Sequence, residues 1–201
     1  SADAVGFAVA TTGAVPRQLG LTRAALTAHG FDGKVGQTMV VPSSSGPTYI
    51  AVGIGDFRKA DASDVRDAAA ALARAAARRT HVATNLVDSV ALDARSAAQA
   101  AVEGFMLGAY RYEDFIPKKT AGITELTVQV RKEDVSVARK DAERAIVLAE
   151  CINAARQLGN APGNVIYPDT LAKHAAALSR RARMQCKVMD ERKLRAGKFG
   201  G

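Results

Sequence analysis

Alternation of apolar and polar residues along the chain predicts a set of short β-strands. Ile123–Val130 alternates between the two kinds of residue, so one face of this strand should be buried and the other polar. Thr38–Val41 and Thr48–Val52 are rich in apolar and β-branched residues. They flank Pro42–Pro47, a turn-forming stretch, so we expect a hairpin. One further strand is expected on each side of the hairpin, at Val5–Val9 and His81–Val87.

Apolar residues at helical spacing predict four helices between and after these strands. Their ranges are Arg17–Ala28, Asp61–Arg79, Ser96–Tyr112 and Val137–Leu158. The second helix begins with the capping residues Asp61 and Asp64. Its expected buried face is Val65, Ala69, Leu72 and Ala76; that of the third helix is Ala98, Val102, Phe105, Met106 and Tyr110. The alternation of strands and helices predicts an α/β domain over residues 1–158, with a mixed central sheet and helices on both of its faces.

The last part of the chain, residues 159–201, is expected to begin a second α/β domain. Gly159–Asn164 is a strong helix break, and it precedes a predicted helix at Pro168–Arg183 and a predicted strand at Cys186–Asp190. This segment has too little apolar material to close a core by itself. We therefore expect it to be poorly ordered or to rest on another subunit.

The positive charge of the chain is concentrated at its C-terminal end. The 201 residues carry a net charge of +8. Residues 1–150 hold 18 Lys and Arg against 17 Asp and Glu, whereas residues 151–201 hold 10 against 3. A basic end of this kind is typical of a contact with nucleic acid or another anionic surface. Alternatively, it is balanced by acidic residues of a larger domain, which is the interpretation we prefer.

The apolar runs and the cysteine content of the sequence indicate the compartment in which the protein is expected. The chain has no apolar run of about 18 residues and no basic start followed by an apolar segment, so we expect a cytoplasmic protein that does not contact membranes. Two cysteines are too few for a disulfide framework. Cys151 and Cys186 are therefore expected to be small, buried apolar residues in a reducing compartment.

Candidate chemical motifs along the chain all have simpler structural interpretations. Gly53-Ile54-Gly55 follows a strand, but Arg58 stands where a dinucleotide loop has its third glycine, so a turn is expected. The remaining candidates are isolated histidines, an adjacent acidic pair and a basic helix end: His29, His81, His174, Glu113–Asp114 and Arg180–Arg183. With aromatic residues at only 5%, a binder that stacks single-stranded bases is disfavoured. The residues alone predict no catalytic, cofactor-binding or metal-binding site.

Three segments, in the same order and spacing, resemble the cytosolic leucyl aminopeptidases. Tyr49–Gly55 is similar to a strand and glycine turn of that family's N-terminal domain. Glu103–Tyr112 is similar to its glycine-containing helix, and Ala154–Asn164 with Pro168 to its domain junction. The junction is the most specific of the three, although the family has a second proline where Gly163 stands.

The resemblance implies a macro-like N-terminal domain, a linking helix and a C-terminal catalytic domain. It also implies a homo-hexamer built from two trimers and two divalent metals, Mn or Zn, that hydrolyse peptides with a preference for N-terminal leucine. The family's metal ligands lie downstream of the position of Gly201, and Asp169, Asp190 and Glu191 do not match them. The resemblance thus implies that this chain holds no metal, is inactive alone and has a structural or oligomerisation role.

A non-enzymatic binding module remains the alternative. A macro-like module for a nucleotide should have an open pocket at the carboxyl ends of the strands, with Gly53–Gly55 on its rim. A DNA-binding module should have a contiguous basic stripe.

Overall fold

The computed structural model describes residues 1–43, 46–117 and 121–200. The chain divides into two units, residues 1–154 and 155–201. The first unit holds a five-stranded sheet in the order β2-β3-β1-β4-β5. The strands are β1 (Ala4–Val9), β2 (Thr38–Val41), β3 (Thr48–Gly53), β4 (His81–Thr84) and β5 (Glu125–Val128).

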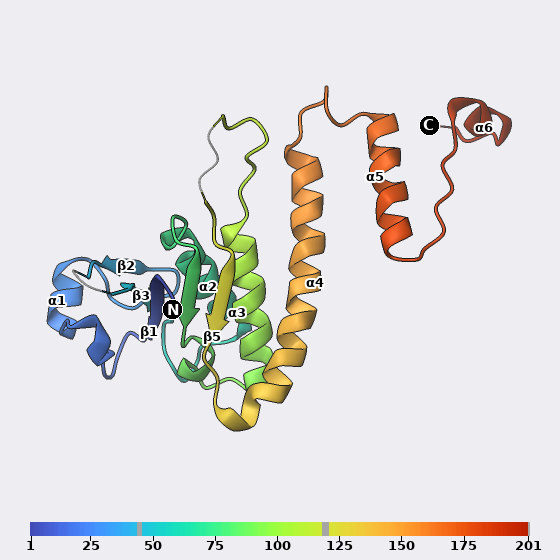
Figure 1. Ribbon diagram of the computed structural model, residues 1–201. Helices are drawn as coiled ribbons and strands as arrows, with labels where there is room; N and C mark the ends of the chain where they lie inside the picture. The colour runs from blue at the N-terminus through green and yellow to red at the C-terminus, as the bar shows by residue number, and fades with distance from the viewer. Residues whose placement is uncertain (44–45, 118–120, 201) are drawn as a thin grey trace. The chain divides into compact units, whose positions relative to one another are not determined.

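The sheet is mixed, as the sequence predicts (Figure 1). β1 runs parallel to both β3 and β4, and β4 runs parallel to β5. Only β2 is antiparallel, and it pairs with β3 in the predicted hairpin, with Thr38 opposite Val52. Residues 44 and 45 of the expected turn lie outside the described residues.

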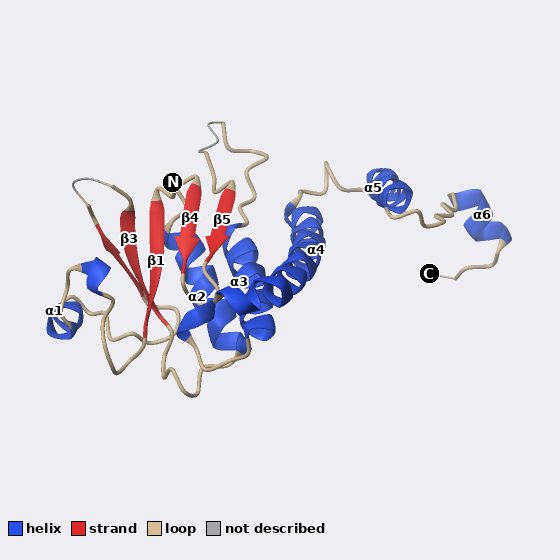
Figure 2. Cartoon of the chain, turned by 60° about the horizontal axis from the view of Figure 1, so that its bottom comes forward, coloured by secondary structure: helices blue, strands red, loops and turns tan. Residues whose placement is uncertain are grey.

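Helices cover both faces of the sheet (Figure 2). On one face lie α2 (Ala62–Ala75), α3 (Ala94–Ala109) and the first part of α4 (Val135–Asn160). On the other face lie the short helices η1 (Arg17–Leu19) and α1 (Arg23–Ala28). Two further 3-10 turns, η2 (Val87–Ser89) and η3 (Lys132–Asp134), precede α3 and α4. The expected α/β domain with helices on both faces is therefore confirmed.

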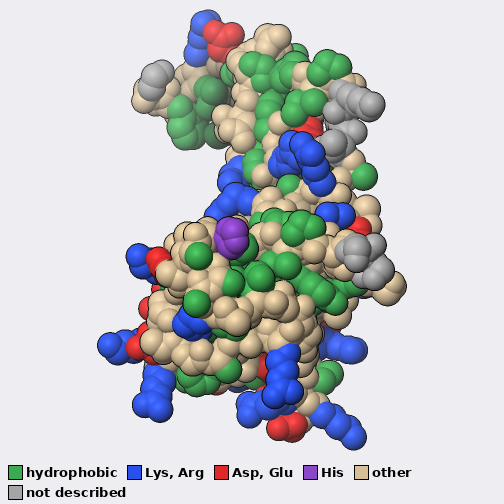
Figure 3. Space-filling view, turned by 90° about the vertical axis from the view of Figure 1, so that its left-hand side faces the viewer, with side chains coloured by type: hydrophobic (Ala, Val, Ile, Leu, Met, Phe, Trp, Pro, Cys, Tyr) green, Lys and Arg blue, Asp and Glu red, His purple; other side chains and the backbone are tan. Residues whose placement is uncertain are grey.

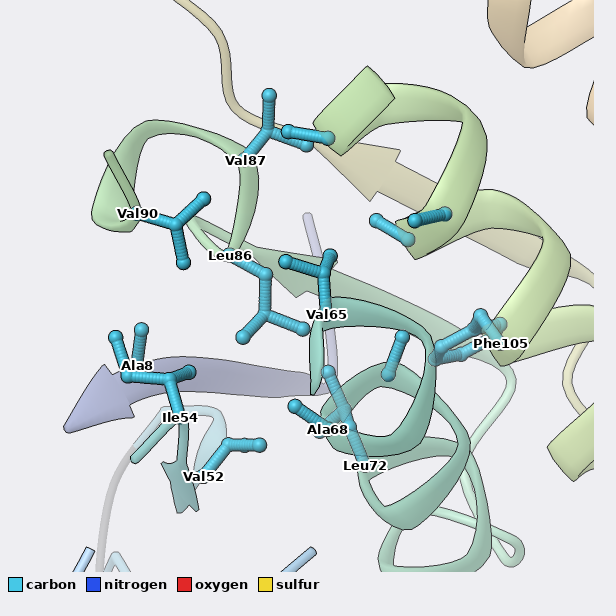
Figure 4. Close-up of a cluster of buried hydrophobic side chains, with 14 of the residues drawn as sticks. Ala8, Val52, Ile54, Val65, Ala68, Leu72, Leu86, Val87, Val90 and Phe105 are labelled. Atoms are coloured by element: carbon cyan, nitrogen blue, oxygen red, sulfur yellow. The ribbon is translucent and has the colours of Figure 1, made fainter. Parts of the chain in front are cut away.

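The larger core lies between the sheet and α2 and α3 (Figure 4). Alternate strand residues such as Ala8 and Val52 point into it and meet Val65 and Leu72 of α2. Val65 and Leu72 are fully buried, as their helical spacing predicts. Gly6 of β1 leaves space for Leu72, since a Cβ at that position would lie 2.5 Å from a methyl group of Leu72.

A smaller core lies on the opposite face, under α1. Val9, Leu19, Leu26, Phe31 and Ala51 form it. It covers only the β1 and β3 side of the sheet, because α1 has six residues and contributes only Leu26 to the buried set. The face of β4 and β5 on this side carries polar side chains instead, among them His81, Glu125 and Thr127, and remains partly exposed.

Several predicted boundaries differ from the observed ones. The helix expected at Arg17–Ala28 is broken at Gly20, which has a φ of +64°. The strand expected at His81–Val87 ends at Thr84, and the Asn85 side chain then accepts a hydrogen bond of 2.9 Å from the backbone N–H of Ala8. Capping determines the starts of two helices. Asp61 and Asp64 form a capping box at α2, and Asp93 caps α3.

The second unit contains α5 (Pro168–Arg181) and α6 (Glu191–Ala196). None of the described residues from 155 to 200 is buried, in agreement with a segment that lacks its own core. The prediction of a strand at Cys186–Asp190 was wrong. This stretch has no ladder partner among the described residues, and a strand without a partner leaves its backbone groups unpaired.

Both cysteines are exposed, so the prediction of buried cysteines was wrong. The buried stripe of α4 includes Ala145 and Ala149. Cys151 lies two residues after Ala149, which is about 200° around the helix and therefore on the opposite side. Cys186 lies in the segment between α5 and α6, where no core forms.

Candidate functional site

The carboxyl ends of β1, β3 and β4 meet at one edge of the sheet, where α/β proteins commonly bind ligands. The Gly53–Gly55 turn lies at this edge, and the chain's own backbone covers it. Gly55 donates a hydrogen bond of 2.9 Å to the Gly33 carbonyl, and Thr11 donates one of 2.9 Å to the Gly55 carbonyl. A Cβ at Gly53 would collide with the Lys34 carbonyl oxygen. Glycine is thus needed here for close backbone approach, as expected for a turn.

This packing does not support a nucleotide-binding module. That alternative requires an open pocket with the glycine turn on its rim, whereas the loop at Gly33–Lys34 packs directly on the turn. A DNA-binding module gains no support either. On the face that includes α1 and β2, Lys and Arg side chains stand in separate groups with acidic residues between them (Figure 3).

The three histidines lie apart. His29 caps α1, His81 lies on β4 and His174 lies in the second unit. His81 Nε2 is 2.8 Å from the Thr127 hydroxyl and 3.5 Å from a Glu125 carboxylate oxygen. Among the residues that the structure describes, no group of three or more His, Cys, Asp or Glu side chains could hold a metal ion.

The acidic residues near the end of the chain have structural partners. Asp190 caps α6 by accepting a hydrogen bond of 2.8 Å from the backbone N–H of Lys193. That hydrogen bond lowers the pKa of the Asp190 carboxyl below its ordinary value. Glu191 forms an ion pair with Arg195, at 2.6 Å. Asp169 lies in the first turn of α5. These side chains do not fit a shared metal site.

The glycine-containing helix is a packing element. Gly104 and Gly108 of α3 lie directly against the backbone of α2 at Arg66 and Ala70. Glu103 accepts a hydrogen bond of 3.2 Å from Arg66. On the other side of α3, the Asn153 side chain of α4 donates a hydrogen bond of 3.2 Å to the Met106 carbonyl. The segment that carries much of the family resemblance therefore holds three helices together.

A second contact fixes the start of α4 against α3. Arg95 donates a hydrogen bond of 2.8 Å to Asp141, which is one of the few buried charged residues. The hydrogen bond to Asp141 raises the pKa of the Arg95 guanidinium. Together with the Asn153 contact to Met106, this ion pair orients α4 parallel to α3.

A cavity of about 670 Å³ lies between α3, β5 and the first part of α4. Its walls are mainly apolar, and its polar groups are Thr124, Glu125, Tyr110 and Arg139. The apolar walls include Val102 and Phe105 of α3, Leu126 and Val128 of β5, and Val135 and Ile146 of α4. The sequence analysis missed this groove. A signal exists in α4, where apolar residues occur on more than one face of the helix.

Those apolar residues of α4 are substantially exposed in the chain. The most exposed is Val147, at 60%. The others are Val135, Val137, Ile146, Leu148 and Ile152. A helix with apolar residues around most of its circumference is normally buried on several sides. An exposed apolar surface of this kind is typical of a contact with another protein. No helix of the described residues is long and apolar enough to cross a bilayer.

Comparison with known proteins identifies the family. Residues 11–119 match the cytosol aminopeptidase family, N-terminal domain. The chain belongs to this family. It is 32% identical over 182 residues to a probable cytosol aminopeptidase of Mycobacterium leprae (strain TN), an alignment of 88% of this chain and 34% of that protein. It is 33% identical over 173 residues to a probable cytosol aminopeptidase of Persephonella marina (strain DSM 14350 / EX-H1), covering 82% and 35%.

Solved structures agree with the family assignment. The bottromycin maturation enzyme BotP in complex with Mn is 28% identical, with a TM-score of 0.80, over 98% of this chain and 40% of that one. A mutant of tomato leucine aminopeptidase has a TM-score of 0.82 at 21% identity, over 99% and 44%, and shows the same fold. The chain spans about a third of the length of the curated relatives it matches. The resemblance to this family, expected from three segments, is confirmed.

Proposed function

We propose that this chain is the N-terminal portion of a cytoplasmic aminopeptidase, in which it orients and supports a catalytic domain. The family match carries this proposal. Leu148 and Ile152 of α4, which are exposed and lie outside the groove lining, support this role because they give a further domain an apolar surface to bury. Residues 1–158 are proposed as the first domain with its linking helix, and residues 159–201 as the beginning of the second.

The reaction proposed for the whole enzyme is hydrolysis of N-terminal residues from peptides, with leucine preferred. Two Mn or Zn ions would activate a water molecule and polarise the scissile carbonyl. We propose that residues outside this chain hold them, since Asp169, Asp190 and Glu191 do not fit a shared metal site. The assembled enzyme is proposed to be a homo-hexamer of two trimers.

Two measurements test this proposal: the activity of the chain alone, and its binding to the catalytic portion of a relative. The pure 201-residue chain, checked for folding by circular dichroism, is assayed with leucine p-nitroanilide and Mn or Zn ions. We expect no turnover. The chain is then mixed with the portion of the Mycobacterium leprae relative that follows the aligned region, and both complex formation and turnover are measured. If the pure chain released p-nitroaniline at a rate proportional to its own concentration, the proposal that residues outside this chain carry the catalytic site would be wrong.

Variants of α4 test whether its exposed apolar side chains bind the catalytic portion. Leu148→Glu and Ile152→Glu place charges on the exposed apolar surface and should abolish co-elution with the catalytic portion. Lys140→Glu, an exposed position of the same helix, is the matched control and should preserve co-elution. Equal behaviour of all three variants would contradict docking through this surface.

A further inference from the structure

The outer edge of the sheet at β5 has unpaired backbone groups. Glu125 donates to the Thr80 carbonyl at 3.0 Å and Gln129 to the Thr84 carbonyl at 2.8 Å, so the odd-numbered residues of β5 face β4. Leu126 and Val128 consequently direct their N–H and C=O groups outward. Within the described part of the chain, these groups have no hydrogen-bond partner. An edge of this kind is a template for another extended chain.

The helix layer extends further than the strand layer on this side. In Figures 1 and 2, α4 lies on the far side of α3, beyond the outer edge of β5. Val135, Arg139, Ala142 and Ile146 recur every three or four residues on the face of α4 that lines the groove. A strand beside β5, at the usual spacing of about 4.8 Å, would lie over this face.

We propose that β5 and this groove form a binding site for an extended peptide segment of another polypeptide, which joins the sheet as an additional strand. Its backbone pairs with the outward groups of Leu126 and Val128. Apolar side chains at every second position enter the groove between α3 and α4. Arg139 lines the groove and is exposed, so its positive charge favours an acidic residue at one end of the segment.

A second copy of this chain does not fit the edge. Pairing two β5 strands about a two-fold axis would set them about 4.8 Å apart. Each copy also brings an α4 that lies beyond its own β5, and a helix with side chains is about 10 Å wide. The two α4 helices would occupy the same space. A single extended segment has no such conflict, and it satisfies the edge groups and the groove together.

The probe is the peptide Asp-Thr-Val-Thr-Val-Thr-Val-amide, labelled with fluorescein at its N-terminal amine, titrated with the 201-residue chain and followed by fluorescence anisotropy. We expect saturable binding. A peptide of the same composition with its valines in one block should bind about tenfold more weakly or worse, because they cannot all enter the groove. Equal binding of the two peptides, or no binding of the first, overturns the proposal.

Backbone pairing is tested by N-methylation. Only every second N–H of an added strand faces β5, so methylating the valine nitrogens or the threonine nitrogens should abolish binding in one case and preserve it in the other. If both methylated peptides lose binding, or if neither does, the peptide does not add to the sheet as a strand.

Variants of the protein locate the site. Val128→Pro removes an outward N–H but no ladder bond, and Ile146→Glu places a charge in the groove. Each should weaken binding about tenfold or more, since one loses a backbone pair and the other the apolar wall. Val147→Glu, which alters a residue of α4 outside the groove lining, should keep the affinity within about twofold. Circular dichroism verifies folding, and an unchanged affinity in both test variants would overturn the assignment.

Discussion

Gly104 of α3 lies against the backbone carbonyl of Arg66 in α2, with no room for a Cβ between them. Small residues along both helices allow this approach, and the buried set of α2 and α3 includes many alanines. The Arg66 side chain then reaches Glu103, at 3.2 Å. Close helix contact and the ion pair thus occur at the same point in the signature segment.

Gly104→Ala should destabilise the chain. The added methyl group collides with the Arg66 carbonyl, and relieving such overpacking costs about 1–3 kcal/mol. Gly159→Ala is the matched control. It is also a helical glycine, but nothing lies within 4 Å of its Cβ position. This change should be neutral or stabilise by up to about 1 kcal/mol, because alanine favours helix. Urea unfolding compares the two, and similar effects would refute the packing argument.

Asp61→Ala should remove the N-cap of α2. The Asp61 carboxylate accepts hydrogen bonds from the backbone N–H groups of Ser63, at 2.8 Å, and Asp64, at 3.0 Å. Loss of such a cap costs about 1 kcal/mol of unfolding free energy. The control is Asp67→Ala, on the exposed side of the same helix, which should change stability by less than about 0.5 kcal/mol. Thermal unfolding by circular dichroism distinguishes the two.

The sequence correctly predicted those features of the fold that are determined by residues close together in the chain. The hairpin of Thr38–Val41 and Thr48–Gly53 follows from its β-branched residues and turn, and the start of α2 follows from Asp61. Cys186–Asp190 has the composition of a strand, but a strand forms only with a partner, and none of the described residues supplies one. The position of Cys151 likewise depends on which side of α4 packs against α3.

The groove beside β5 could not be predicted from periodicity. The alternation in Ile123–Val130 correctly indicates a half-buried strand, but not that it lies at the edge of the sheet. Edge position is set by the order of strands, which depends on pairings between distant segments such as β4 with β5. The space between α3 and α4 follows from that packing.

Tyr112→Phe should leave stability unchanged or raise it. The Tyr112 hydroxyl is buried and has no hydrogen-bond partner among the described residues. Loss of contact with water raises the pKa of this hydroxyl above its ordinary value. Removing an unpaired hydroxyl also removes the cost of taking it out of water. The ring contact with Phe115, at a centroid distance of 6.1 Å, is retained. Tyr167→Phe, at an exposed tyrosine, is the control. A clear loss of stability in Tyr112→Phe alone would contradict this expectation.

Asp3 links the start of β1 to β4 and should make stability depend on pH. Its carboxylate accepts hydrogen bonds from the Thr80 N–H and hydroxyl, both at 3.0 Å, and from the His81 N–H, at 2.9 Å. The hydrogen bond from the Thr80 backbone is the largest cause that lowers the pKa of Asp3 below 3.8. A lowered pKa in the folded state stabilises the fold above the unfolded value, and this stabilisation is lost as the pH falls through the folded value.

The free energy of unfolding of the native chain should therefore fall between about pH 5 and pH 3 more steeply than that of Asp3→Asn. Thr80→Ala removes the hydroxyl donor but retains both backbone donors, so its profile should lie between the other two. Urea midpoints measured at half-unit intervals of pH give the three profiles. At neutral pH, Asp3→Asn should be the least stable of the three proteins, because the neutral amide accepts these hydrogen bonds more weakly than the carboxylate. The difference in unfolding free energy between the native chain and Asp3→Asn should become smaller as the pH falls and Asp3 is protonated. Parallel profiles for the native chain and Asp3→Asn across this range would show that the carboxylate is not held in its charged form by β4.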